Sequence, residues 1–73
     1  MTDKARKVLR ELFEAMMGDI DLLPREHRDA AAAAEQSGGK VGRARVVADY
    51  VAGMTDRYAI GEHRRLFTPA DPF

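Results

Sequence analysis

The sequence predicts an all-α fold, a small bundle of three main helices and a short fourth one. Three observations support this class. Apolar residues recur every three or four positions in two separate segments, which is the spacing of one face of a helix. Glycines and prolines occur between the predicted helices, where they favour turns. No segment alternates apolar and polar residues in the manner of a strand.

The chain is short for an independent fold. Its 73 residues form one domain at most, and a core of this size supplies only about 3–5 kcal/mol. There is no cysteine, so neither a disulfide nor a thiolate metal site reinforces that core. We assign residues 1–67 to one helical domain and residues 68–73, with two prolines, to a flexible tail. We therefore expect either a self-associating unit or a piece of something larger.

The first two predicted helices cover residues 3–17 and 24–36. An apolar stripe defines the first, and Gly18 is suited to end it. Pro24 suits the first position of the second helix, because its φ is fixed and it lacks an N–H. Alanines dominate the second helix and offer little side chain to bury. It should lie on the surface or pack closely against a neighbour.

The third predicted helix covers residues 41–60 and is the longest. It follows the sequence SGGK at 37–40, where two adjacent glycines predict a flexible break. Gly61 should introduce a bend or a weak point, because glycine is unfavourable inside a helix. A short fourth helix is then expected over residues 61–67.

The core should form where the first and third helices pack, antiparallel or obliquely, through their apolar stripes. This packing would bury one face of each helix and leave the charged faces in solvent. The predicted contact residues are Val8, Leu9, Leu12, Phe13 and Met16 on the first helix, and Val47, Val51, Met54 and Tyr58 on the third.

Charge and hydropathy argue against several classes of function. Twelve lysines and arginines balance twelve aspartates and glutamates, so no net field gathers nucleic acid or an anionic membrane. No apolar run approaches the ~20 residues that a membrane span needs. The N-terminus is polar and charged, unlike a signal peptide. We expect a cytoplasmic protein with no membrane partner.

Local basic clusters are candidates for phosphate contact. The candidates are Arg43 and Arg45 after the glycine break, and Arg64 and Arg65 near the last helix end. Solvated residues at helix ends are an equally good explanation, because the aromatic residues follow apolar faces and do not interleave with these cations. His63 is better explained as a partly exposed histidine than as a proton-transfer group, because no partner cluster accompanies it.

The stretch DYVAGMTDRY is the most specific feature of the sequence. On a continuous helix Asp49, Gly53 and Asp56 would share one side, with the glycine leaving a notch in an acidic ridge. The aspartates would either orient arginines or a substrate, or cap neighbouring helix ends and pair with Arg45 and Arg57. The candidates for substrate contact or assembly are Asp49, Tyr50, Asp56, Arg57 and Tyr58.

Two segments carry a family resemblance. One is RARVVADYVAGMTDRYAIGEHRRLF at 43–67, in which DYVAGMTDRYA is the specific part, and the other is KARKVLRELFEAMM at 4–17, followed by LLP at 22–24. They resemble the C-terminal region of bacterial deoxyguanosine triphosphate triphosphohydrolase-like proteins, members of the HD-domain phosphohydrolase superfamily. Residues 25–41 carry no such resemblance.

The resemblance implies a helical, oligomeric parent enzyme that cuts a deoxynucleoside triphosphate (dNTP) into deoxynucleoside and triphosphate. Its divalent metal, magnesium or manganese, would be held by histidines and aspartates that include an adjacent His-Asp pair. This chain has no His-Asp dipeptide, so we expect no metal, no cofactor and no catalytic residue in it. The implied partners are the N-terminal catalytic HD domain of the same parent chain, further copies in a homo-oligomer, and the parent's dNTP.

The sequence therefore supports two hypotheses. In the first, the chain is the C-terminal accessory and assembly region of a dNTP triphosphohydrolase, a fragment of a larger helical enzyme. In the second, it is a free-standing helical module that binds a protein or, weakly, a nucleic acid through its basic cluster. A reading frame upstream of Met1 that encodes a His-Asp pair would favour the first hypothesis.

Overall fold

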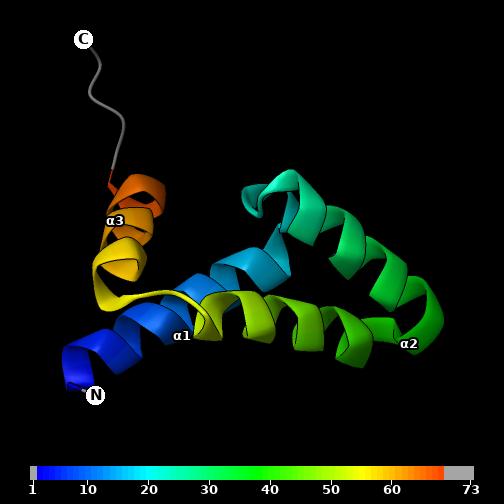
Figure 1. Cartoon of the computed structure of the whole chain (residues 1–73), viewed down its shortest axis with the longest axis horizontal. Coiled ribbons are helices and arrows are strands. Elements are labelled where there is room, and N and C mark those ends of the chain that lie inside the picture. The colour runs from blue at the N-terminus through cyan, green and yellow to red at the C-terminus, as the bar shows by residue number, and fades with distance from the viewer. Residues whose placement is uncertain (1, 69–73) are drawn as a thin grey trace, which may run out of the picture.

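The computed structural model describes residues 2–68, and within that range it contains helices and no strand (Figure 1). The elements in order are α1 (Asp3–Gly18), the short 3-10 helix η1 (Ile20–Leu22), α2 (Arg25–Ala52) and α3 (Asp56–Phe67). The all-α class is confirmed. Most of the predicted tail, from residue 69 onward, lies outside the described residues.

Local signals in the sequence set the ends of α1. The Thr2 side-chain oxygen accepts a hydrogen bond from the backbone N–H of Ala5 at 3.1 Å, which satisfies one of the free donors at the helix start. At the other end, the backbone N–H of Asp19 donates to the carbonyl of Ala15. The helix ends at Gly18, within one residue of the predicted end.

Helix α2 is a hairpin of two arms joined at Gly39. That residue has φ 63° and ψ −153°, a conformation that costs glycine little and other residues much. The arms leave the bend side by side and open away from it (Figure 1). The predicted break at 37–40 is confirmed. The prediction that Pro24 is the first residue of this helix is wrong. Pro24 precedes the helix as its N-cap, with an extended ψ of 153°.

Close packing near the bend explains the glycine at position 42. A Cβ built on Gly42 would lie 2.3 Å from the carbonyl oxygen of Ala34 in the facing arm. Only glycine allows the two backbones to approach so closely. The alanine-rich helix meets both of its expected descriptions: Ala31 is fully buried against a neighbour, whereas Ala30 and Ala33 are exposed on the surface.

The predicted helix over 41–60 is wrong, because it spans two elements. The second arm of α2 ends at Ala52, where the N–H of Gly53 bonds back to the carbonyl of Asp49. Thr55 then caps α3 by accepting from the N–H of Tyr58 at 3.1 Å. The predicted short helix over 61–67 is the second half of α3.

Gly61 is not the predicted bend. It lies inside α3, which continues through it, and a Cβ built there would meet nothing within 4 Å. The break falls earlier, at the turn before Thr55, because a glycine followed by a threonine cap and an acidic first turn ends one helix and starts another.

The core lies where α1 contacts both α2 and α3. The buried side chains are Val8, Leu12, Met16, Leu23, Ala31, Val47, Val51 and Ala59. The predicted packing is largely confirmed: five predicted contact residues are in this set, and Leu9, Phe13 and Met54 pack against it. Tyr58 is the exception. It is 48% exposed, because α3 starts in a new direction and turns Ala59 toward the core instead.

Candidate functional site

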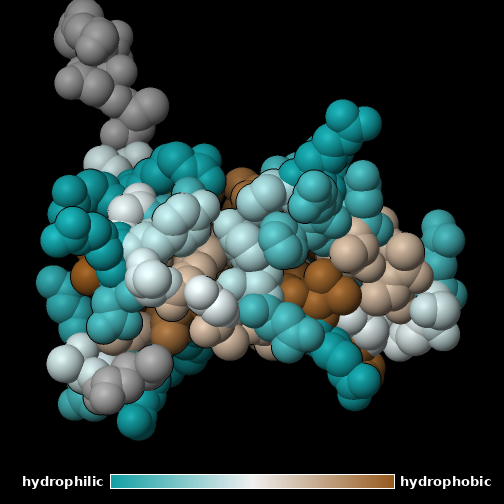
Figure 2. Space-filling view, in the orientation of Figure 1, coloured by the Kyte–Doolittle hydropathy of each residue, from teal (hydrophilic) through white to brown (hydrophobic). Residues whose placement is uncertain are grey.

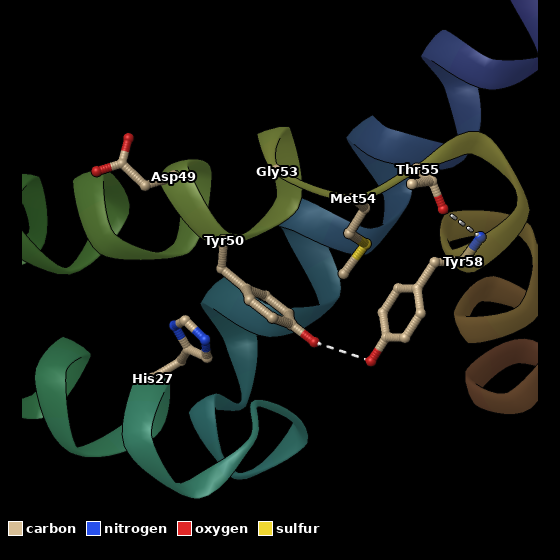
Figure 3. Close-up of a pocket in the computed structure, with 7 residues that line it drawn as sticks. All are labelled: His27, Asp49, Tyr50, Gly53, Met54, Thr55 and Tyr58. Carbon is tan, nitrogen blue, oxygen red and sulfur yellow. Dashed lines mark hydrogen bonds between the residues drawn. The ribbon is translucent and has the colours of Figure 1, made fainter.

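A cavity of about 470 Å³ opens where the hairpin of α2 meets the start of α3 (Figure 3). Both arms of α2, the turn and α3 contribute to its wall, so only the folded arrangement assembles it. The lining residues are His27, Asp49, Tyr50, Gly53, Met54, Thr55 and Tyr58.

Two tyrosine hydroxyls meet in the wall of the cavity. The Oη atoms of Tyr50 and Tyr58 lie 3.4 Å apart, and either hydroxyl can donate to the other. This hydrogen bond joins the second arm of α2 to α3 across the turn (Figure 3). Burial raises the pKa of Tyr50 above its ordinary value, and the hydrogen bond to Tyr58 adds to that rise. The Tyr50 hydroxyl is therefore protonated at neutral pH.

His27 supports Tyr50 from the first arm of α2. The two ring centroids are 4.5 Å apart and the ring planes are inclined by 41°, a tilted aromatic contact. His27 was not among the residues predicted for a site. No local pattern in the sequence indicated it, because the hairpin at Gly39 is what brings it beside Tyr50.

The predicted acidic ridge on one continuous helix is wrong, because the turn before Thr55 divides it. Asp49 lines the cavity, but its carboxylate points away from Tyr50 (Figure 3). Asp56 belongs to the first turn of α3, and neither it nor Arg57 is among the lining residues. Of the five candidates from this stretch, the structure brings together Asp49, Tyr50 and Tyr58.

None of the four basic candidates lines this cavity. Arg43 is mostly buried; its guanidinium donates to the backbone carbonyl of Met17 and to a carboxylate oxygen of Glu35 at 3.2 Å. It thereby ties α1 and both arms of α2 together. The guanidinium of Arg65 donates to the carboxylate of Glu62 one turn earlier. The remaining two, Arg45 and Arg64, are exposed.

A second polar contact joins α3 to α1. Nε2 of His63 lies 2.6 Å from a carboxylate oxygen of Glu11, and the two residues are 52 positions apart in the chain. This hydrogen bond lowers the pKa of Glu11 below its ordinary value. The His63 ring also lies against Phe67, with centroids 4.6 Å apart. His63, for which the sequence showed no partner, is therefore paired with Glu11.

Residues 2–68 contain neither a candidate metal cluster nor a membrane-spanning helix. No three histidine, aspartate or glutamate side chains in that range come together in a group able to hold a metal ion. No helix in the described part of the chain has both the length and the apolar character to span a membrane.

The chain is similar to a known protein family and to parts of longer curated proteins. The family model described as "phosphohydrolase-associated domain" matches residues 1–65, so the likeness also covers residues 25–41, where no resemblance was expected. Similar curated proteins carry the name deoxyguanosinetriphosphate triphosphohydrolase-like protein. The one from Bordetella pertussis (strain Tohama I) is 54% identical over 67 residues, and the one from Azoarcus sp. (strain BH72) is 49% identical over 67 residues. The one from Caulobacter sp. (strain K31) is 50% identical over 64 residues.

These relatives are much longer than this chain. The matches cover 92% of the chain for the Bordetella and Azoarcus proteins and 88% for the Caulobacter protein. The same matches span 15% of the Bordetella and Caulobacter proteins and 16% of the Azoarcus protein. No solved structure matches the chain.

Proposed function

Because the chain belongs to the phosphohydrolase-associated domain family, we propose that it is the C-terminal accessory and assembly region of a longer dNTP triphosphohydrolase. The parent enzyme would act on dGTP or a related nucleotide and release deoxynucleoside and triphosphate. In this proposal the parent is a cytoplasmic homo-oligomer. Its magnesium or manganese site and its catalytic residues belong to an N-terminal HD domain.

The observation that carries the proposal is the unequal coverage of the matches. Identity near 50% extends over nearly the whole of this chain but over only 15–16% of relatives named for triphosphohydrolase activity. A chain that matches only a small part of its relatives is best explained as one part of an enzyme. The reaction centre of that enzyme would lie elsewhere in the parent chain.

The shape of the molecule supports an assembly role. Its extents are 39 × 34 × 17 Å, so the molecule is a flat slab. A slab this thin buries few side chains completely, and apolar side chains emerge between charged ones on the face in Figure 2. Four large hydrophobic side chains remain exposed on the helices of the described part of the chain: Val41, Tyr58, Ile60 and Phe67. Packing against the catalytic domain or a second copy would cover such residues.

A chimeric enzyme tests this function. The segment of the Bordetella pertussis relative that matches this chain is replaced by the corresponding residues of this chain, and in a parallel variant it is deleted. We expect the chimera to release triphosphate from dGTP with magnesium or manganese. The deletion variant should lose activity or fail to assemble, as measured by size-exclusion chromatography.

The free 73-residue chain is the control. We expect it to release no triphosphate from dGTP under the same conditions. Turnover by the pure chain, or full activity and normal assembly of the deletion variant, would contradict the proposal. A chimera that is folded and assembled but inactive would limit the role of this region to assembly.

A further inference from the structure

The cavity between α2 and α3 has the walls of a site for a flat aromatic ring. Three of its seven lining side chains, those of His27, Tyr50 and Tyr58, are aromatic, and Met54 adds a polarisable apolar surface. The ring of His27 contacts the ring of Tyr50, with centroids 4.5 Å apart. Tyr58 is 48% exposed although it belongs to the wall, so its ring is accessible to a ligand. Stacking on exposed aromatic faces is the sequence-tolerant way in which proteins hold nucleobases.

The hydroxyl pair gives this apolar wall a polar edge. When one of the hydroxyls of Tyr50 and Tyr58 donates to the other, the pair keeps one donor proton and several acceptor lone pairs. The edge of a nucleobase presents both donors and acceptors, so the pair can bond to it in either direction. Few polar groups in a mostly apolar cavity are typical of small-molecule sites.

Size and charge narrow the choice of ligand. The volume of about 470 Å³ lies within the range of roughly 300–1,000 Å³ that such sites occupy. Among the described residues that line it there is no lysine or arginine, and the acidic lining residue, Asp49, points its carboxylate away from Tyr50. A triphosphate would find no cation among these lining residues, and Arg65, whose charge acts on Tyr50, is already paired with Glu62. The cavity therefore suits the base of a nucleotide and not its phosphates.

We infer that this cavity binds the base of a deoxynucleoside, with Tyr58 as the stacking surface and the two tyrosine hydroxyls at the polar edge of the base. The inference rests on the proposed function, because it takes the ligand class from the nucleotide for which the relatives are named. It deepens that function by giving this region a contact with the nucleotide in addition to its role in assembly. The sugar and phosphates lie outside the cavity.

Nuclear magnetic resonance titration of the 73-residue chain tests the inference. The probes are deoxyguanosine and deoxyadenosine, with deoxyribose and inorganic triphosphate as separate arms. We expect both deoxynucleosides to shift the Met54 methyl signal and the ring signals of His27, Tyr50 and Tyr58. Deoxyribose and inorganic triphosphate should leave these signals in place.

Matched variants separate stacking from a general effect on the fold. Tyr58→Ala should weaken deoxynucleoside binding about tenfold or more, because a stacked base is lost, whereas Tyr58→Phe should keep it within about threefold. Phe67→Ala is the control, since Phe67 is also 48% exposed on α3 but does not line this cavity. It should leave the affinity unchanged.

Gly53→Leu provides a second test should Tyr58→Ala fail to fold. Gly53 lines the cavity, and a Cβ built there makes only ordinary contacts, the nearest with the carbonyl oxygen of Asp49 at 3.5 Å. The added side chain should obstruct the cavity and abolish the deoxynucleoside shifts while the other signals of the chain stay in place. Binding that survives this obstruction would place the ligand elsewhere and overturn the inference.

Two further outcomes would also overturn it. One is the absence of shifts at the four signals with every deoxynucleoside, as expected if the parent fills the cavity with a segment of its own chain. The other is an equal response to inorganic triphosphate, which would indicate phosphate binding. The chimera assay is independent of these results: an active chimera without base binding in the free chain rejects only this inference, and a deletion variant with full activity and normal assembly rejects the proposed function.

Discussion

The two ends of α3 are attached to the rest of the molecule in different ways. Near its start, two neutral tyrosine hydroxyls join it to α2 beside an open cavity. Near its end, the hydrogen bond between His63 and Glu11 joins it to α1. Along α1 the core is closely packed, with Leu12 and Met16 fully buried. The difference suggests that the contact with α1 provides stability and that the junction with α2 leaves room for a ligand.

The largest expected effect comes from removing Leu12 from the α1 side. Leu12→Ala should lower the free energy of unfolding by about 2–5 kcal/mol, because it leaves a cavity in a fully buried position. Urea unfolding followed by circular dichroism measures the change. In a chain this small such a loss is enough to unfold it. Ile60→Ala, at a position 38% exposed, is the control and should have little effect. Equal effects would show that α1 does not form the stable side.

A smaller effect should follow from changing the hairpin that supports the cavity. Gly42→Ala should destabilise the chain by about 1–3 kcal/mol, because the new Cβ would lie 2.3 Å from the carbonyl oxygen of Ala34 and force the arms apart. Thermal unfolding measures the loss, and the His27 and Tyr50 ring signals report any separation of the arms.

Gly61→Ala is the matched control for Gly42→Ala. Gly61 lies inside α3 with open space around it, so alanine there should stabilise the chain by up to about 1 kcal/mol. If both substitutions had the same sign, the close approach of the two arms would not be the reason why glycine occurs at position 42.

The smallest expected effect is a change of unfolding free energy with pH. It should differ between the His63–Glu11 contact and the Tyr50–Tyr58 contact, the two attachments of α3. The hydrogen bond from His63 lowers the pKa of folded Glu11 below its ordinary value of 4.5, so its stabilising contribution is present above pH 4.5 and is lost as the pH falls through the lower, folded pKa. The difference in unfolding free energy between the original chain and Glu11→Gln should therefore shrink below that pH. Chemical unfolding over a pH series measures it.

Tyr50→Phe is the comparison at the other end of α3. Burial and the hydrogen bond to Tyr58 keep the pKa of Tyr50 above its ordinary value, so the hydroxyl stays protonated throughout the acid range. The loss from Tyr50→Phe should therefore stay constant from about pH 3 to pH 8, well below the ordinary tyrosine pKa of about 10. A Glu11→Gln effect that is equally constant with pH would show that the His63 contact does not depend on the charge of Glu11.

Much of the fold could be predicted from local pattern. The stripe of α1 identified Leu12 and Met16 as core residues, and the two glycines at 38 and 39 marked the hairpin bend. The main error was the end of the third predicted helix. Its apolar period continued by chance through the turn before Thr55, so periodicity hid a break that the threonine cap and acidic first turn could have indicated.

Less of the candidate site could be predicted. Tyr50 and Tyr58 were both named as site candidates from the sequence, but Tyr58 was also expected in the core, whereas it is 48% exposed and lines the cavity. His27 is in the other arm of the hairpin, and Glu11 is 52 positions from its partner His63. Contacts between residues so far apart depend on how the helices are placed, and no local spacing encodes them.

The sequence by itself determined the helical class, the apolar stripe of α1, the bend at the paired glycines and the resemblance to a family of hydrolases. These follow from local spacing, backbone freedom and recognisable segments. The tertiary structure decided which residues meet. By ending α2 at Ala52 and starting α3 in a new direction, the turn moved Tyr58 out of the core, placed Ala59 in it and opened the cavity beside Tyr50. The reason is geometric: changing the direction of one helix moves every side chain that follows.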